Sequence, residues 1–200
     1  MSEYKPIRRK GAQSTKFEPG GLRRHRHEHW HIDNQIYFIT ARCRDRRPAF
    51  ATEECKQIFW RQYRLKMNAF GMTPIITSLL DNHYHFLAHL REGQNLTPLM
   101  RGLHGSIARY INEVTPEEQQ VKPLFREKTG KQYFDGAIRT PRQFRRCFRY
   151  IERQCIRHGV AADPDTHPHT IIDVPMDRAL KRALQINAFL PGVPAPRRGV

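Results

Sequence analysis

Two short β-type runs that meet at a tight turn constrain the fold of this chain more than any other feature. The runs are MTPIITSLL at 72–80 and HYHFLAHL at 83–90, and the Asp-Asn pair between them suits a tight turn because both residues tolerate unusual backbone angles. Successive side chains of a strand point to opposite faces. The second run therefore separates into one row of His83, His85, Leu87 and His89 and another of Tyr84, Phe86, Ala88 and Leu90. The second row predicts a core face, whereas the histidine row needs another explanation.

The elements around this hairpin follow the order β-α-β-β-α-β. A strand is expected within 31–43, helices at 52–70, 97–114 and 140–160, and a fourth strand at 132–139. The expected helix starts are Thr52, Thr97 before Pro98, and Thr140 before Pro141. This order predicts an α+β fold of the ferredoxin-like, split βαβ type, which is an antiparallel sheet with helices on one face and an additional C-terminal helix. The run 83–90 would then be central, with its histidine face left open.

Changes in composition divide the 200 residues into three parts. Residues 1–28 combine basic residues, Gly and Pro without apolar periodicity, which predicts a basic flexible arm. Residues 29–160 carry the folded domain. Residues 161–200 form a C-terminal extension that is rich in Pro and polar residues, and a short helical pattern near 176–190 is its one clear element.

The net charge points to a polyanionic partner. Thirty-five Lys and Arg against nineteen Asp and Glu give a net charge of +16, with a pI near 10.3. Such a balance favours nucleic acid. A membrane surface also attracts cationic proteins, but no stretch approaches the roughly 20 apolar residues that span a bilayer, and the N-terminus lacks the apolar segment of a signal peptide. We therefore expect a soluble intracellular protein that binds nucleic acid and no membrane.

The paired histidines are the first candidate for chemistry. Two imidazoles at i and i+2 of a strand project in parallel and can close on one divalent metal. Exposed histidines on a basic protein can equally be solvated or bind phosphate, and the spacing alone favours that alternative. The same spacing recurs in HRHEHWH at 25–31 and HPH at 167–169, which we expect to be solvated because neither lies on a strand. Only His83 and His85 have the rigid backing that a metal site needs, and His89 is expected to lie too far along the strand.

The four cysteines offer no competing metal site. They show no Cys-x-x-Cys pair, so buried thiols are expected and a zinc ribbon is not.

The helix at 140–160 places a tyrosine beside an amide. Its apolar stripe consists of Phe144, Phe148, Ile151 and Cys155. Tyr150 and Gln154 lie one turn apart, about a quarter-turn off this stripe. Three arginines, Arg146, Arg153 and Arg157, border them on the side away from the core. This arrangement suits a site that binds a phosphodiester and attacks it through the tyrosine. Most tyrosines on helices, however, only pack their ring against the protein and leave the hydroxyl solvated.

Taken together, these motifs resemble the single-tyrosine HUH transposases, especially the REP-associated tyrosine transposases. HUH denotes histidine, hydrophobic residue, histidine, which His83-Tyr84-His85 matches; Asp81-Asn82 stands where the family often has Pro-Asn. The runs LMRGLHGSIARYINE, QYFDGAIR and FRYIERQCIRHGV also follow the family's order and spacing. The resemblance covers about residues 30–160 and implies that residues 29–160 are an HUH transposase-like catalytic domain.

The resemblance also implies a mechanism. His83, His85 and Gln154 would hold a divalent metal, Mg²⁺ or Mn²⁺, and Tyr150 would be the nucleophile. The implied function is metal-dependent cleavage and rejoining of single-stranded, hairpin-associated DNA through a 5′-phosphotyrosine intermediate, as in DNA transposition. The implied partner is single-stranded or hairpin DNA in a prokaryotic cytoplasm, associated with the nucleoid, with a homodimer and a monomer both left open.

This chain departs from the family at two positions of the helix. The family helix commonly runs Tyr-Ile-x-x-Asn-Pro-Val, whereas Gln154 and Cys155 replace Asn and Pro here. Gln keeps an amide oxygen, but Cys removes a helix-ending residue. A domesticated or inactive descendant therefore stays open.

Two other classes of function compete with this one. A noncatalytic single-stranded nucleic-acid-binding protein, derived from such a transposase or built like an RNA-recognition domain, would share the sheet and the charge. We find neither an aromatic pair on the histidine face nor a glycine-aromatic signature, which disfavours the RNA-recognition domain. A zinc hydrolase would need a further His or carboxylate and a general base, and no such residues are placed by the sequence.

Overall fold

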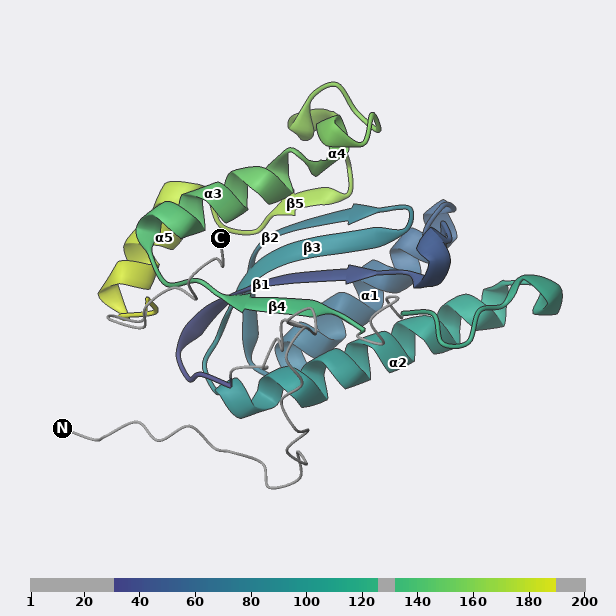
Figure 1. Ribbon diagram of the computed structural model, residues 1–200, viewed down its shortest axis with the longest axis horizontal. Helices are drawn as coiled ribbons and strands as arrows, with labels where there is room; N and C mark the ends of the chain where they lie inside the picture. The colour runs from purple at the N-terminus through teal and green to yellow at the C-terminus, as the bar shows by residue number, and fades with distance from the viewer. Residues whose placement is uncertain (1–30, 126–131, 190–200) are drawn as a thin grey trace, which may run out of the picture.

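The computed structural model describes residues 31–125 and 132–189, so the arm expected at 1–28 lies outside the described residues. The described backbone forms a five-stranded antiparallel sheet in the order β4-β1-β3-β2-β5 (Figure 1). The strands are β1 (Gln35–Arg42), β2 (Met72–Leu80), β3 (His83–Leu90), β4 (Phe134–Ala137) and β5 (Thr170–Ile172). The central position of β3 between β1 and β2 confirms the α+β, split βαβ architecture.

The register of the sheet fixes which side chains share a face. The predicted hairpin is confirmed, because β2 ends at Leu80, which pairs with His83 at the start of β3. His85 lies opposite Thr40 on β1 and Ser78 on β2. Directly opposed residues point to the same side of an antiparallel sheet. These three side chains therefore form one row across the histidine face.

Two helices, α1 (Glu53–Ala69) and α2 (Leu96–Val114), cover the opposite face of the sheet (Figure 1). The predicted cap of α1 is confirmed, since the Thr52 hydroxyl accepts from the Cys55 amide at 3.2 Å. The predicted start of α2 is wrong. A 3₁₀ turn, Gly93–Asn95, leads directly into α2, so Thr97 and Pro98 already lie inside its first turn and Asn95 is the N-cap.

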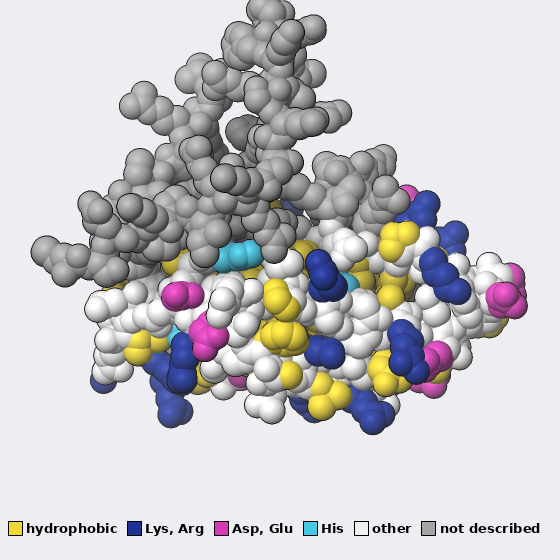
Figure 2. Space-filling model, turned by 90° about the horizontal axis from the view of Figure 1, so that it is seen from below, with side chains coloured by type: hydrophobic (Ala, Val, Ile, Leu, Met, Phe, Trp, Pro, Cys, Tyr) yellow, Lys and Arg dark blue, Asp and Glu magenta, His cyan; other side chains and the backbone are white. Residues whose placement is uncertain are grey.

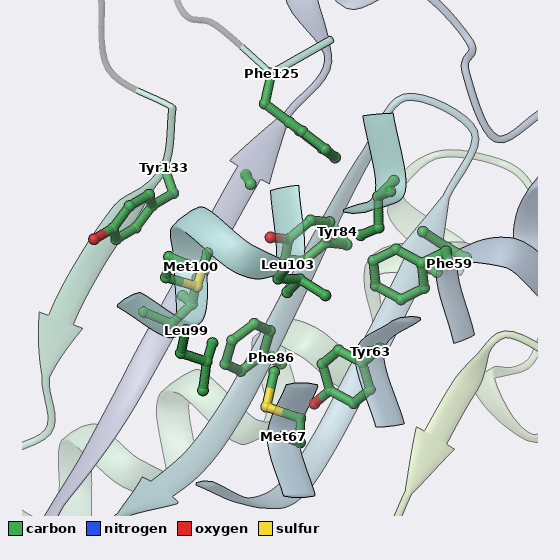
Figure 3. Close-up of a cluster of buried hydrophobic side chains, with 14 of the residues drawn as sticks. Phe59, Tyr63, Met67, Tyr84, Phe86, Leu99, Met100, Leu103, Phe125 and Tyr133 are labelled. Carbon is green, nitrogen blue, oxygen red and sulfur yellow. The ribbon is translucent and has the colours of Figure 1, made fainter. Parts of the chain in front are cut away.

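The core beneath α1 and α2 contains the predicted row from β3. Tyr84 and Phe86 are fully buried against Phe59 and Tyr63 of α1 and Leu103 of α2 (Figure 3). Burying one such side chain stabilises the fold by roughly 1.5–3 kcal/mol. This packing holds β3 rigidly from one side, and the same strand presents its histidines on the other.

The histidine face is not open, contrary to the prediction. It is covered by α3 (Pro141–Glu152), α4 (Gln154–Arg157) and α5 (Met176–Gln185) (Figure 1). A second hydrophobic cluster lies between these helices and the sheet, and it includes Ile36, Ile76, Leu87, Phe144, Phe148, Ile151 and Leu180. The sheet is thus a middle layer with a hydrophobic core on each side.

The helix predicted at 140–160 begins and ends as expected but is interrupted. The Thr140 hydroxyl accepts from the Gln143 amide at 3.1 Å, and Gly159 follows the helical region with a φ of +66°. Arg153 adopts φ −91° and ψ 10°, which separates α3 from α4. The interruption at Arg153 therefore lies between Tyr150, in the last turn of α3, and Gln154, the first residue of α4.

Residues 161–189 join the same core, although the sequence assigned them one short helical pattern and no strand. β5 pairs with the outer edge of β2, and Ala179, Leu180 and Ala183 of α5 are buried in the second cluster. The short 3₁₀ helices are Arg44–Arg46, Glu117–Gln119 and Pro164–Thr166.

Cys43, Cys55 and Cys155 are buried free thiols, as expected, and Cys147 is half-buried. No helix among the described residues is long and apolar enough to cross a membrane. On the side of α2, Lys and Arg side chains lie in separate groups with hydrophobic and acidic side chains between them (Figure 2).

Candidate active site

The paired histidines of β3 lie side by side on the face covered by α3 and α4. Their ring centroids are 5.0 Å apart and their planes are nearly perpendicular, at 87°. Each side chain is only 3% exposed, so neither is the solvated surface histidine of the alternative interpretation. The strand aims both rings the same way because they stand two residues apart.

Each imidazole makes a hydrogen bond through its Nδ1 atom. His83 Nδ1 lies 2.6 Å from the amide oxygen of Asn82, and His85 Nδ1 lies 2.6 Å from the hydroxyl of Thr40. His85 Nε2 is buried and has no hydrogen-bond partner among the described residues. Buried polar atoms are rarely left unsatisfied, so this atom is a candidate for binding something that the protein itself does not supply.

The environment favours neutral imidazoles. Burial, together with the nearby charges of His158 and Arg42, lowers the pKa of His83 to about 4, although the hydrogen bond with the Gln154 side chain acts in the opposite direction. Burial, followed by the effect of His83, also holds the pKa of His85 well below its usual value. A neutral imidazole is the form that ligates metals.

Tyr150 extends from the last turn of α3 toward the same pair. Its ring centroid is 5.3 Å from that of His85, with the rings edge to face, and 5.9 Å from that of Phe38 on β1. The residue is 38% exposed, so Tyr150 is accessible from the solvent. The guanidinium carbon of Arg157 lies 5.7 Å from the centroid of the Tyr150 ring, which is the range of a cation–π contact.

Gln154 opens α4 and is nearly fully buried. Its side-chain nitrogen donates to the backbone carbonyl of Tyr150 at 2.9 Å, and its Oε1 has no partner among the described residues. The fold thus brings together an unpartnered imidazole nitrogen and an unpartnered amide oxygen, both buried. Among the described residues, no group of three or more His, Cys, Asp or Glu could hold a metal ion. Any site here therefore depends on an amide oxygen beside two imidazoles, a donor set that suits a divalent cation.

The comparison with known families gives the decisive observation. The sequence model of the family described as "Transposase IS200 like" matches residues 31–154, which is more than half of the chain. The chain belongs to the IS200-like transposase family. No match was found among curated proteins.

Two solved structures are similar to this transposase. A REP-associated tyrosine transposase bound to a REP hairpin superposes with a TM-score of 0.60 at 15% identity, over 86% of this chain and 93% of that one. A protein from Deinococcus radiodurans, proposed to be a transposase, matches with a TM-score of 0.39 at 16% identity, over 62% of this chain and 92% of that one. The first match shows that the transposase shares its fold with a REP-associated enzyme.

The predicted arginines of the transposase occupy different positions. Arg157 lies beside Tyr150, as described above. Arg146 and Arg153 are exposed, the former on α3 and the latter at the junction of α3 and α4. Their side chains are accessible to a polyanion, but within the described residues the cation that stacks on the Tyr150 ring comes from Arg157.

The structure adds an imidazole that the sequence interpretation missed. The ring centroid of His158 lies 4.8 Å from that of His83. His158 follows Gln154 by four residues and Tyr150 by eight, so helical spacing could have placed all three on one stripe.

The structure also corrects the expectation that the histidine face has no aromatic pair. Phe38 and Phe134 lie there with ring centroids 6.2 Å apart, edge to face. Phe134 shares the face because it pairs with Thr40, which lies opposite His85. No local pattern carries this information, since it depends on the pairing of β4 with β1.

His167 and His169 are structural histidines rather than solvated ones. Trp60 Nε1 donates to His169 Nδ1 at 3.1 Å, and His169 Nε2 lies 3.1 Å from a carboxylate oxygen of Glu53. His167 Nδ1 lies 3.0 Å from the Thr170 hydroxyl. These contacts hold the loop before β5 against α1, so the expectation of solvation was wrong for 167–169. Of the segment 25–31, only His31 is described; it is exposed and its Nε2 lies 2.9 Å from the Thr97 hydroxyl.

His89 lies apart from the pair. Its Nε2 is 2.8 Å from the side-chain oxygen of Asn34, at the far end of β3.

Proposed function

We propose that this transposase cleaves and rejoins single-stranded DNA in a metal-dependent reaction, with Tyr150 as the nucleophile and a 5′-phosphotyrosine intermediate. The observation that supports it most strongly is the approach of the accessible Tyr150 ring to His85, 5.3 Å between centroids, beside two buried acceptor atoms that have no partner in the described part of the chain. A phosphodiester placed there would meet a nucleophile and a cation site at once.

His83, His85 and Gln154 are the residues that would hold the cation, which we propose to be Mg²⁺ or Mn²⁺. The fit rests on Nε2 of His85 and Oε1 of Gln154, neither of which has a hydrogen-bond partner within residues 31–125 and 132–189. When bound, such a cation polarises the scissile phosphate and neutralises developing charge. Two imidazoles among the donors favour Mn²⁺ over Mg²⁺, because Mg²⁺ prefers oxygen ligands.

The proposed chemical step exchanges one phosphoester for another. The Tyr150 oxygen attacks phosphorus and forms the new O–P bond, while the bond from phosphorus to the 3′ oxygen breaks. The tyrosine proton is released, and the departing 3′ oxygen takes up a proton to become a hydroxyl. Attack by the 3′-hydroxyl of another strand on the phosphotyrosine reverses the exchange, so joining needs no nucleotide cofactor.

The arginines and the overall charge would bind the DNA backbone. Arg157, whose guanidinium group lies over the Tyr150 ring, would stabilise negative charge at the Tyr150 oxygen and at the phosphate, and the exposed Arg146 and Arg153 would extend the cationic surface. The structural relative is bound to a REP hairpin, and we propose a hairpin-bearing single strand as the substrate of this chain as well. The setting we propose is a prokaryotic cytoplasm and its nucleoid, with the enzyme acting as a monomer or a homodimer.

The test is covalent trapping on a hairpin oligonucleotide that carries a label at its 3′ end, with Mn²⁺ present. The wild-type chain is expected to form a labelled protein adduct that is absent from Tyr150→Phe, while the two proteins bind the oligonucleotide equally. Tyr110→Phe is the matched control, since Tyr110 lies on α2 and is 39% exposed, close to the 38% of Tyr150. An adduct that survives in Tyr150→Phe would contradict the assignment of the nucleophile.

A second candidate is a noncatalytic single-stranded nucleic-acid-binding protein derived from such a transposase. The aromatic pair Phe38 and Phe134 on the histidine face favours it, because bases stack on such rings. This function predicts binding that weakens steeply with salt and no adduct in the wild-type chain under any metal condition.

A further inference from the structure

The two imidazoles of the candidate metal site are each anchored by a different part of the sheet. Asn82 lies in the turn before β3 and contacts Nδ1 of His83, whereas Thr40 lies on β1 and contacts Nδ1 of His85, each at 2.6 Å. A neutral imidazole carries a proton on one ring nitrogen and a lone pair on the other. The contact at Nδ1 therefore decides whether Nε2 is free to bind a cation.

For His83 the hydrogen-bond pattern fixes the proton. The side-chain nitrogen of Asn82 donates to the backbone carbonyl of Arg46 at 3.2 Å, which identifies the amide oxygen as the atom that faces the histidine. An amide oxygen can only accept. Nδ1 of His83 must therefore carry the proton, and Nε2 keeps its lone pair.

For His85 the other ring nitrogen, Nε2, identifies the tautomer. A hydroxyl can donate or accept, so the contact with Thr40 allows either tautomer. If Thr40 donated to Nδ1, Nε2 would be a buried N–H without an acceptor, since that atom has no partner among the described residues. An unsatisfied buried donor is costly, whereas a free lone pair at the same place can be satisfied by a cation.

We propose that Thr40 and Asn82 are positioning residues that hold both imidazoles with the proton on Nδ1 and so keep the two Nε2 lone pairs available to the divalent cation. The proposal rests on the proposed function, because positioning the imidazoles matters only if the divalent cation binds to them. Loss of a hydrogen bond of this kind typically weakens metal affinity about 10–100-fold. Thr40 acts through His85 and Asn82 acts through His83, and neither needs to touch DNA.

If Thr40 served only the strand, Thr40→Val would leave the tautomer of His85 and the affinity for Mn²⁺ unchanged. Thr40 is a β-branched residue in the middle of a strand, and Val would serve the strand equally well. Thr40→Val keeps the shape and removes the hydroxyl, whereas Thr40→Ser keeps the hydroxyl and removes the methyl group. Thr73→Val is the matched control, because Thr73 is an exposed threonine of β2 that pairs with His89 rather than with the metal pair.

The experiment has two measurements on the full chain. Long-range ¹H–¹⁵N NMR of the metal-free protein identifies the tautomer of each imidazole, and titration with Mn²⁺ followed by electron paramagnetic resonance gives the affinity. Wild type and Thr73→Val are expected to hold His83 and His85 with Nδ1 protonated. Thr40→Val is expected to lose that preference at His85 and to bind Mn²⁺ about 10–100-fold more weakly. Thr40→Ser should restore both properties, and Asn82→Ala should repeat the loss at His83.

The outcomes separate this proposal from the proposed function. Nε2-protonated imidazoles in the wild-type protein, or equal Mn²⁺ affinity in wild type and Thr40→Val, would overturn the positioning role even if the DNA adduct forms. A wild type that has the expected tautomers but binds no Mn²⁺ refutes both the metal-dependent reaction and the purpose assigned to Thr40 and Asn82. Tyr150→Phe plays no part in either measurement, so failure of the nucleophile assignment leaves the result intact.

Discussion

A buried histidine on α2 makes the stability of this transposase depend on pH. His104 is 4% exposed, its Nε2 lies 2.6 Å from the Tyr84 hydroxyl, and its ring stacks on Phe125 with centroids 4.0 Å apart. Tyr84 stands between His83 and His85 on β3, so this contact anchors the strand that carries the candidate site. Burial lowers the pKa of His104 from 6.5 to about 3.

The direction of the effect follows from proton uptake. The unfolded chain protonates this imidazole near pH 6.5, whereas the folded protein does so only near pH 3. Between these values the unfolded state binds more protons, so the free energy of unfolding falls as the pH falls. Integrating between pH 7 and pH 5 with these two pKa values gives a loss of about 2 kcal/mol from His104 alone.

Urea unfolding of the wild type and of His104→Gln at both pH values measures this contribution. The variant keeps a polar group near Tyr84 but cannot titrate in this range. Other buried histidines contribute equally to the two proteins, so the wild type is expected to lose about 2 kcal/mol more than the variant between pH 7 and pH 5. Equal losses in the two proteins would refute the claim that the folded protein holds His104 neutral well below pH 6.5.

Three further perturbations test the fold and the DNA surface. Gly93→Ala should destabilise the protein by roughly 1–3 kcal/mol in urea unfolding, because a Cβ there would collide with the backbone of Ile32, and wild-type stability would contradict this close approach. Thr140→Ala should lose about 1 kcal/mol, since it removes the cap of α3, and an unchanged unfolding midpoint would show that the cap is dispensable. Arg157→Gln should weaken the binding of single-stranded DNA and make the fall of log affinity with log salt less steep, by about 0.7 in the slope. Salt titration measures this slope, and an unchanged value would exclude a phosphate contact.

The local elements of this protein could be predicted because they depend on local patterns. The hairpin at 72–90, the Thr52 and Thr140 caps and the separation of Tyr84 from His83 and His85 all follow from spacing and turn chemistry. The start of α2 was predicted wrongly. Thr97-Pro98 has the composition of a cap, but the preceding 3₁₀ turn had already set the helical direction.

The surroundings of the candidate site could not be predicted in the same way. His158 was within reach of helical spacing, but Phe134 reaches the histidine face only through the pairing of β4 with β1. The burial of His169 likewise depends on contacts with α1, more than a hundred residues earlier in the chain.

The sequence by itself determined which side chains can share a face, because the side-chain period of a strand is two and that of a helix is 3.6 residues. It therefore determined that His83 and His85 point together and that Tyr150 and Gln154 lie one turn apart. Only the tertiary structure decided that α3, α4 and α5 cover the histidine face and bury both imidazoles. It also decided that Thr40, 45 residues from His85, supplies the hydroxyl at its Nδ1, because strand register depends on the packing of the whole sheet rather than on any local pattern.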